Sequence, residues 1–205
     1  MTSAPASTRR GRPGHDRAQV LAVAVALFNE QGFDATSVAD LTGRLGLTKS
    51  ALYHHFPSKD ALLQVALDEA LDALEAVLRD AESDAGDAAQ RLRVIVRGAV
   101  SVLTDKLPYV TLLLRVRGNS DVERAALARR RSFDQAVSHL VHVAQDEGML
   151  RPDVDAAVAT RLIFGMINSL VEWYRPGGAV DADELGEDVL RMVLKGLQAD
   201  SAPRP

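Results

Sequence analysis

The chain has 205 residues, of which 47% are hydrophobic and 25% are charged, values typical of a globular protein with a sizeable buried core. It contains no cysteine, which excludes disulfides, cysteine-based zinc sites and a thiol nucleophile. The formal net charge of −4 argues mildly against a nucleic-acid-binding protein. However, residues 1–60 hold seven basic and five acidic side chains, whereas the rest of the chain holds 17 basic and 23 acidic ones. A slightly basic N-terminal segment followed by an acidic remainder indicates two parts of the chain with separate functions.

Residues 1–14 combine Ser, Thr, Pro, Gly and Arg, which predicts a disordered basic arm. The arm is either a solvated tail or a segment that reaches DNA, as basic arms can. From Asp16, apolar residues recur at three- and four-residue spacing, which predicts a helix that ends at Gly32. Ser37, followed three residues later by Asp40, resembles a capping box and predicts the start of a second helix.

Gly46 ends the second helix, and Thr48 is a capping candidate for a short third one. A long fourth helix is predicted from Asp60 to about Asp80. Five more helices are predicted at about 89–103, 109–116, 121–147, 153–174 and 183–197. Strand signals are absent, and the low aromatic content also favours helix.

The expected fold is therefore all-α, with about nine helices. We expect an N-terminal three-helix helix-turn-helix domain at 15–60, a C-terminal helical domain at 61–200 and a tail at 201–205. No apolar run reaches the roughly 18–20 residues that span a bilayer, and the start of the chain lacks the apolar segment of a secretory signal. These features predict a cytoplasmic protein without a membrane partner.

Residues 40–59 carry the most informative pattern, two short helices separated by a turn that contains glycine. In a DNA-binding motif of this kind, the second helix exposes small or polar residues so that its backbone can enter a major groove about 12 Å wide. Such residues begin the predicted third helix at Thr48, Lys49, Ser50 and Ala51. Longer side chains that can reach phosphates follow at Tyr53, His54 and Lys59.

The run from Val20 to Leu63 is similar to the N-terminal DNA-binding domain of the TetR family of bacterial transcription repressors. The resemblance rests on short motifs along this run: Leu27-Phe28, Gly32-Phe33, Thr36-Ser37-Val38, Asp40-Leu41, Gly46-Leu47, Leu52-Tyr53-His54-His55-Phe56 and Ser58-Lys59. It implies a homodimer built on the last two helices and a ligand cavity in each subunit. It also implies a palindromic operator that is released when a ligand binds.

Carried over to this sequence, the resemblance implies three kinds of DNA contact. Thr36 or Ser37 corresponds to a phosphate contact of the second helix. Base-reading positions correspond to Lys49, Ser50 and Ala51, and phosphate-contacting positions to Tyr53, His54 and Lys59. Alternatives remain open for several side chains, because Tyr53 could be a packing residue, Lys59 a surface charge and His55 a capping or core histidine rather than a base reader.

The helix predicted at 153–174 is apolar nearly all round, so we expect it to be buried on more than one side. Together with the last helix it is expected to pair with a second copy, although both could instead belong to the core of the monomer. The candidate interface residues are Gly165, Ser169, Leu185, Val189, Val193 and Leu197.

The other side of that helix and the preceding four helices are expected to line a cavity for a small, largely apolar effector, although an ordinary core would show the same pattern. The candidate ligand-binding residues are Leu112, Leu113, Phe133, Val137, Leu140, Phe164, Asn168 and Trp173.

Residues 173–178 resemble a segment of some actinobacterial members that sense acyl-CoA thioesters. A thioester of that kind needs cations for its phosphates. The candidate cations are Arg115, Arg117, Arg129, Arg130 and Arg131, although a run of arginines is more typical of a solvated, salt-bridged face.

His139, His142 and Asp146 share one helix face, a pattern more typical of a polar surface than of a metal site, so we expect neither a metal nor a cofactor. The sequence lacks a nucleophile elbow, a Gly-rich phosphate loop and a zinc motif, which argues against an enzyme. A purely structural helical dimer would leave the cluster of Lys49, Tyr53, His54 and Lys59 unexplained. The sequence therefore predicts a ligand-responsive, DNA-binding transcriptional repressor.

Overall fold

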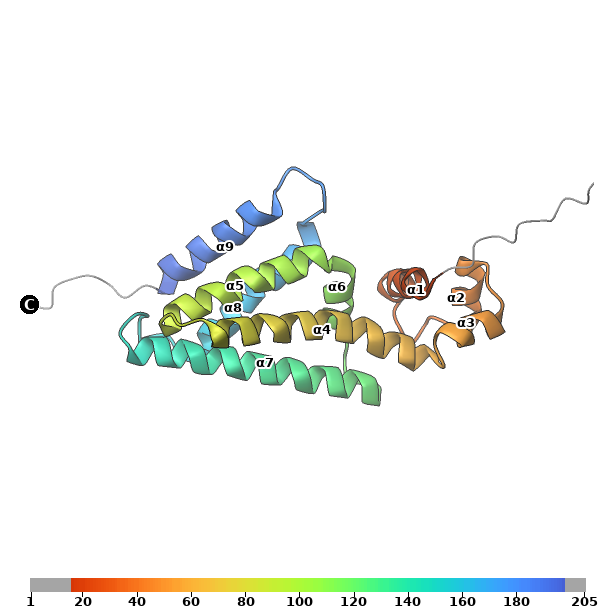
Figure 1. Cartoon of the computed structure of the whole chain (residues 1–205), viewed down its shortest axis with the longest axis horizontal. Helices are drawn as coiled ribbons and strands as arrows, with labels where there is room; N and C mark the ends of the chain where they lie inside the picture. The colour runs from red at the N-terminus through yellow and green to blue at the C-terminus, as the bar shows by residue number, and fades with distance from the viewer. Residues whose placement is uncertain (1–15, 198–205) are drawn as a thin grey trace, which may run out of the picture. The chain divides into compact units, whose positions relative to one another are not determined.

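The computed structural model describes residues 16–197, and this part of the chain contains nine helices and no strands (Figure 1). The helices are α1 (Arg17–Gln31), α2 (Val38–Leu45), α3 (Lys49–His55), α4 (Lys59–Ser83), α5 (Ala88–Asp105), α6 (Leu107–Arg115), α7 (Asp121–Asp146), α8 (Ala156–Trp173) and α9 (Ala182–Leu197). The all-α prediction is confirmed. The predicted arm at 1–14 and tail at 201–205 lie outside the described residues. The chain divides into two compact units between Leu62 and Leu63, inside α4.

Side chains cap the helices of the first unit. In α2, the Asp40 N–H donates to Ser37 Oγ at 3.1 Å, and the Ser37 N–H donates to Asp40 Oδ2 at 2.8 Å. This reciprocal pair is the predicted capping box, and it satisfies two N–H groups that would otherwise lack partners. Thr48 caps α3 with a single hydrogen bond, which its hydroxyl oxygen accepts from the Ala51 N–H at 3.2 Å. Gly46 lies between α2 and α3 with φ of +63°, a left-handed conformation that costs glycine little.

The core of the first unit gathers apolar side chains from α1, α2 and α3. Its most deeply buried large side chains include Phe28, Leu41, Leu52 and Phe56. Leu52 and Phe56 anchor α3 by one face, so the opposite face of this short helix remains in solvent. A pair of hydrogen bonds from Arg44 to Glu30, at 2.8 and 3.4 Å, adds a surface link between α2 and α1.

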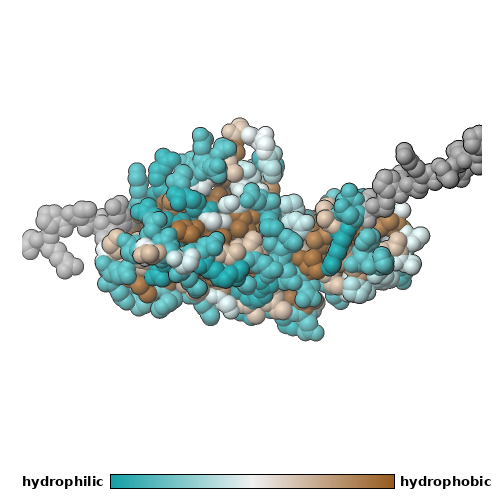
Figure 2. Space-filling model, in the orientation of Figure 1, coloured by the Kyte–Doolittle hydropathy of each residue, from teal (hydrophilic) through white to brown (hydrophobic). Residues whose placement is uncertain are grey.

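In the second unit, α5 packs against α6, α7, α8 and α9, and Figure 1 shows α5 running among these helices. Close packing also brings α5 against α4, because a Cβ added to Gly98 would lie 2.6 Å from Val77 Cγ1. No real side chain tolerates such a distance, so only glycine permits this approach at position 98. The face of the unit seen in Figure 2 is mostly hydrophilic, with apolar side chains showing between the helices.

Two loops of the second unit are fixed by single side chains. Glu123 is buried, and its Oε2 accepts hydrogen bonds from the backbone N–H groups of Arg117, Gly118 and Asn119 at 3.0, 2.7 and 2.9 Å. Gln145 Nε2 donates to the carbonyls of Arg151 and Val154 at 2.9 and 2.7 Å. These contacts order the connections that precede α7 and α8.

Several helix ends differ slightly from the sequence-based expectation. Helix α4 continues to Ser83, and α6 begins at Leu107 with Pro108 in its first turn, where the missing N–H of proline is tolerated. Helix α8 begins at Ala156 rather than near Asp153, because Asp155 supplies the cap by accepting from the Val158 N–H at 3.0 Å. No helix within residues 16–197 is long and apolar enough to cross a membrane.

Candidate functional site

The solvent-facing side of α3 carries polar and basic side chains. Lys49, Ser50, Tyr53 and His54 are exposed, and Ala51 is half-buried. The Lys49 ammonium lies 5.7 Å from the centroid of the Tyr53 ring, a distance at which a cation and an aromatic face attract each other. The exposed Thr48 sits at the start of the helix, where its hydroxyl oxygen is used as the cap. The structure thus brings six of the nine candidate DNA-binding residues together on α3 and its cap.

Thr36 and Ser37, the two candidate phosphate contacts at the start of α2, differ in exposure. Ser37 is exposed at the cap, where its hydroxyl donates to Asp40 Oδ2 at 2.6 Å. Thr36 is only 1% exposed, and its hydroxyl donates to the Gly32 carbonyl at 2.7 Å. Of the two, Ser37 is the one that a phosphate can approach.

Hydrogen bonds to Ser37 also affect the carboxyl group of Asp40. The Ser37 hydroxyl and backbone N–H both donate to this carboxylate, and they lower the pKa of Asp40 below its usual value. The carboxylate therefore stays charged and keeps the N-terminus of α2 capped at neutral pH.

Lys59 is a half-buried side chain with two backbone partners in the preceding loop. Its ammonium donates to the carbonyls of Phe33 and Thr36 at 2.8 and 2.9 Å, and it lies 4.2 Å from the centroid of the Phe33 ring. An ammonium has three donors, so these bonds use two of them. Lys59 fastens the loop between α1 and α2 to the start of α4, a role that the sequence pattern did not indicate.

Two further contacts in the first unit had no sequence signal. The Arg17 guanidinium lies 4.7 Å from the centroid of the Phe56 ring, and Glu30 pairs with Arg44. Both join residues that are far apart in the sequence, so periodicity could not reveal them. The first joins α1 to the end of α3, and the second joins α1 to α2.

The second unit contains a small cavity among α4, α5, α6, α7 and α8. Its volume is about 40 Å³, and its lining includes four predicted ligand residues, Leu113, Phe133, Phe164 and Asn168. The rings of Phe133 and Phe164 meet edge to face, with centroids 5.3 Å apart. We call this space the central cavity.

The lining of the central cavity also includes three polar residues, Arg130, Asp134 and Asn168. Burial raises the pKa of Asp134, while the positive charges of Arg130 and Arg161 act in the opposite direction. A mostly apolar space with a few polar groups is typical of a small-molecule site.

The other predicted ligand residues lie elsewhere. Leu112 and Val137 are buried but do not line the central cavity, and Leu140 lines a different cavity nearer the C-terminal end of α7. Trp173 is 49% exposed at the end of α8. Periodicity identified apolar positions but could not show which of them border an open space.

The arginines considered for a phosphate-bearing ligand have different environments. Arg129 forms ion pairs with Asp68, Asp72 and Glu75 on α4, at 2.7, 2.5 and 2.7 Å. Hydrogen bonding to Glu75 raises the pKa of Arg129 most strongly, although burial opposes the shift. Arg130 belongs to the central cavity, whereas the side chains of Arg115, Arg117 and Arg131 are exposed. Arg129 therefore links α7 to α4 through ion pairs.

The predicted interface residues fall into two groups. Leu185, Val189 and Val193 are buried within the single chain, where α9 packs mainly on α5, and Leu197 is half-buried. Gly165 and Ser169 are exposed on α8. Large exposed apolar side chains lie along the same helix at Val158, Leu162 and Trp173, with exposed fractions of 44%, 65% and 49%. Another, Met192, is 63% exposed on α9.

The histidines considered for a metal lie at the surface. His142 contacts Asp146, with Nε2 and Oδ2 3.6 Å apart, and His139 is exposed. Within residues 16–197, no three His, Asp or Glu side chains gather closely enough to hold a metal ion.

Two helices joined by a left-handed turn, with a small and basic exposed face on the second helix, define a helix-turn-helix DNA-binding protein. The family of bacterial regulatory proteins called the tetR family matches residues 20–66, and the tetracyclin repressor-like C-terminal domain matches residues 85–197. The chain belongs to the TetR family of DNA-binding transcriptional regulators, as its sequence motifs predicted.

Known relatives are similar over nearly the whole chain. A crystal structure of a TetR-family regulator from Streptomyces coelicolor A3 is 49% identical, covers 88% of this chain and 91% of its own, and gives a TM-score of 0.82. The ketosteroid transcriptional regulator KstR2 of Mycobacterium tuberculosis is 27% identical over 93% and 98% of the two chains, also with a TM-score of 0.82. The HTH-type transcriptional repressor KstR2 of Rhodococcus jostii is 28% identical over 96% of this chain and 98% of its own. These relatives are regulators rather than enzymes, and those named KstR2 support repression as the mode of regulation.

Proposed function

We propose that this chain is a ligand-responsive repressor that binds a palindromic operator as a homodimer and leaves it when a small, largely apolar molecule binds. The exposed face of α3 carries this proposal. Its small residues Ser50 and Ala51 let the helix backbone approach base edges, while Tyr53 and His54 reach toward phosphates. Such a regulator acts in the cytoplasm, where the DNA is.

A homodimer supplies the second reading helix. Two α3 helices must enter successive major grooves about 34–36 Å apart. The exposed row on α8, made of Val158, Leu162 and Trp173 with the small Gly165 and Ser169 between them, is the surface that we assign to the second copy. The other predicted interface residues of α9 have a role inside the chain. They hold α9 on α5, and they are Leu185, Val189 and Val193.

The central cavity is the proposed effector site. Its present volume of about 40 Å³ accommodates little more than a water molecule. A larger effector must therefore separate the Phe133 and Phe164 rings, and with them α7 and α8. Arg130 is the one cation in the lining, Asp134 and Asn168 are its other polar residues, and the remaining lining residues are apolar, so the cavity suits an apolar effector better than an acyl-CoA thioester with several phosphates.

Selection from random duplex DNA tests the DNA-binding part of the proposal. We expect enrichment of an inverted repeat. The Ser50→Ala variant should change the enriched bases, whereas Tyr53→Phe should weaken binding to every sequence by a similar factor. Equal losses on selected and random DNA for the Ser50 variant would contradict the division of roles.

Titration of the protein–operator complex with decanol and with decanoyl-CoA tests the effector site. We expect decanol to release the DNA. The Leu113→Trp variant should keep its DNA affinity but resist release, because the larger side chain fills the central cavity. Release by the thioester alone would favour the acyl-CoA alternative.

A further inference from the structure

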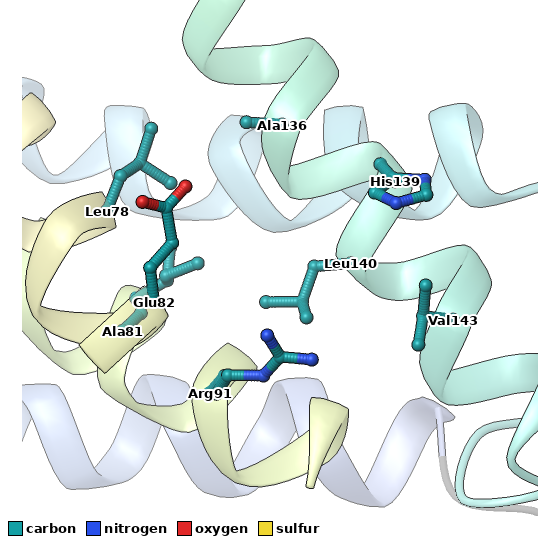
Figure 3. A pocket seen from close by; sticks show the side chains of 9 residues that line it. Leu78, Ala81, Glu82, Arg91, Ala136, His139, Leu140 and Val143 are labelled. Atoms are coloured by element: carbon teal, nitrogen blue, oxygen red, sulfur yellow. The ribbon is translucent and has the colours of Figure 1, made fainter. Parts of the chain in front are cut away.

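A second cavity in the same unit lies between the C-terminal part of α4, the start of α5 and the C-terminal half of α7 (Figure 3). Its volume is about 170 Å³, and it shares no lining residue with the central cavity. Its walls are formed mainly by the apolar side chains of Leu78, Ala81, Ile95, Ala136, Leu140 and Val143. An apolar cavity of about 150 Å³ can hold benzene, so this one has the size for a single ring or a short branched chain.

One cationic side chain reaches into this apolar space. In Figure 3 the Arg91 guanidinium extends from α5 toward Leu140, whereas the Glu82 carboxylate points toward Leu78. Arg91 Nε is buried and has no hydrogen-bond partner. None of the ion pairs between described residues includes Arg91, although guanidinium groups in such surroundings are normally paired.

A buried donor without an acceptor destabilises a folded protein, so such groups are rare and point to a missing partner. The partner of a guanidinium fork is typically a carboxylate, which accepts two parallel N–H···O bonds. A fully hydrated inorganic anion would gain nothing from the apolar walls. A carboxylate with an apolar body satisfies both the Arg91 donor and the walls around it.

We infer that this second cavity binds small aromatic or branched-chain carboxylates, with the carboxylate on Arg91 and the apolar body against Leu140 and Ile95. The exposed Glu82 and His139 mark the side from which such a ligand enters. The site shares no lining residue with the proposed effector cavity, and its occupation requires no DNA.

Benzoate binding to the full-length protein, measured by calorimetry without DNA, tests the inference. We expect saturable binding that Arg91→Met weakens at least about tenfold, because a charge-assisted hydrogen bond is lost. The matched control is Arg93→Met, which removes an exposed arginine of the same helix and should leave the benzoate affinity unchanged. Acetate lacks the apolar body and benzyl alcohol lacks the charge, so both should bind at least tenfold more weakly than benzoate.

Methyl-resolved NMR locates the site without relying on a variant. Benzoate should shift the Leu78, Leu140 and Val143 methyl signals of the wild-type protein more than that of Leu113 in the central cavity. If Arg91→Met fails to fold, Ala136→Phe fills the second cavity and should abolish binding instead. The inference is overturned if wild-type protein shows no saturable binding, if Arg91→Met binds as tightly as wild type, or if these methyl signals do not move. None of these results depends on operator binding, so they leave the proposed repressor function untouched.

Discussion

At the scale of single residues, the two lysines of the DNA-binding unit illustrate how one residue type serves two purposes. Lys49 is exposed on α3 beside Tyr53, whereas the Lys59 ammonium is held by the carbonyls of Phe33 and Thr36. The first can contact DNA without cost to the fold. The second maintains the loop that leads into α2.

Substituting these lysines should therefore produce opposite results. Lys59→Met should lower the free energy of unfolding by about 1–3 kcal/mol, because two part-buried carbonyls lose a charged donor. Lys49→Met should change that free energy by less than about 0.5 kcal/mol yet weaken DNA binding. Urea unfolding and DNA titration measure the two effects. If Lys59→Met unfolds like wild type but loses DNA affinity, the lysine is a phosphate contact instead.

The capping box of α2 gives a prediction about pH. The pKa of Asp40 is lowered from its ordinary 3.8 by hydrogen bonds from Ser37, so its stabilising effect is present above that value and is lost as the pH falls through the lowered pKa. Ser37→Ala should return the Asp40 pKa toward 3.8, as followed by the NMR titration of its carboxyl carbon. Ser50→Ala, at the exposed start of α3, serves as the control and should leave the Asp40 titration unchanged.

At the scale of elements, local signals explain what the sequence could predict. Caps at Ser37 and Thr48 and the turn at Gly46 act over three or four residues, so each could be read from its neighbours. Contacts between distant segments could not be read in this way. Lys59 bonds to residues 23 and 26 positions earlier, and Arg129 bonds to Glu75 and Asp68, which lie 54 and 61 positions earlier.

The faces of α8 and α9 show the same limit. Periodicity correctly marked their apolar positions, but two apolar neighbours, α5 and a second copy, would both select such residues. The structure places Leu185 and Val189 against the rest of the chain and leaves Leu162 exposed. Only three-dimensional packing can decide which partner covers which residue.

The packing of α7 against α4 depends strongly on Arg129. Arg129→Met would leave Asp68, Asp72 and Glu75 close together without a cation, so we expect the free energy of unfolding to fall by about 1–3 kcal/mol, between the values for exposed and buried pairs. The loss should shrink in acid, because burial raises the pKa of Asp68 and this carboxylate becomes neutral as the pH falls through the raised pKa. Urea unfolding at several pH values measures it. Arg131→Met, which removes an exposed arginine of the same helix, should have an effect below about 0.5 kcal/mol.

At the scale of the whole molecule, the negative net charge is compatible with DNA binding. The basic excess lies in residues 1–60, and the acidic remainder repels DNA and so restricts contact to the reading helix. So small a basic excess allows few phosphate contacts per subunit. Tight binding should therefore require two subunits.

Leu162→Glu tests that requirement, because a charge in the middle of the proposed α8 surface should prevent association. We expect a monomer by light scattering and a salt dependence of DNA binding with about half the wild-type slope. Met149→Glu introduces the same charge at another exposed apolar residue outside α8, and it should remain dimeric. A Leu162→Glu protein that stays dimeric would place the interface elsewhere.

The contact between Val77 and Gly98 divides α4 and α5 into two stretches. Leu74 and Ala99 line the central cavity on one side of it, and Leu78 and Ile95 line the second cavity on the other. Since the helices already touch at this point, we expect it to act as a pivot. A ligand that separates α4 and α5 around one cavity should bring them closer together around the other. Ligands in the two cavities of one subunit would therefore compete although they do not touch, and each would weaken the binding of the other by the same factor.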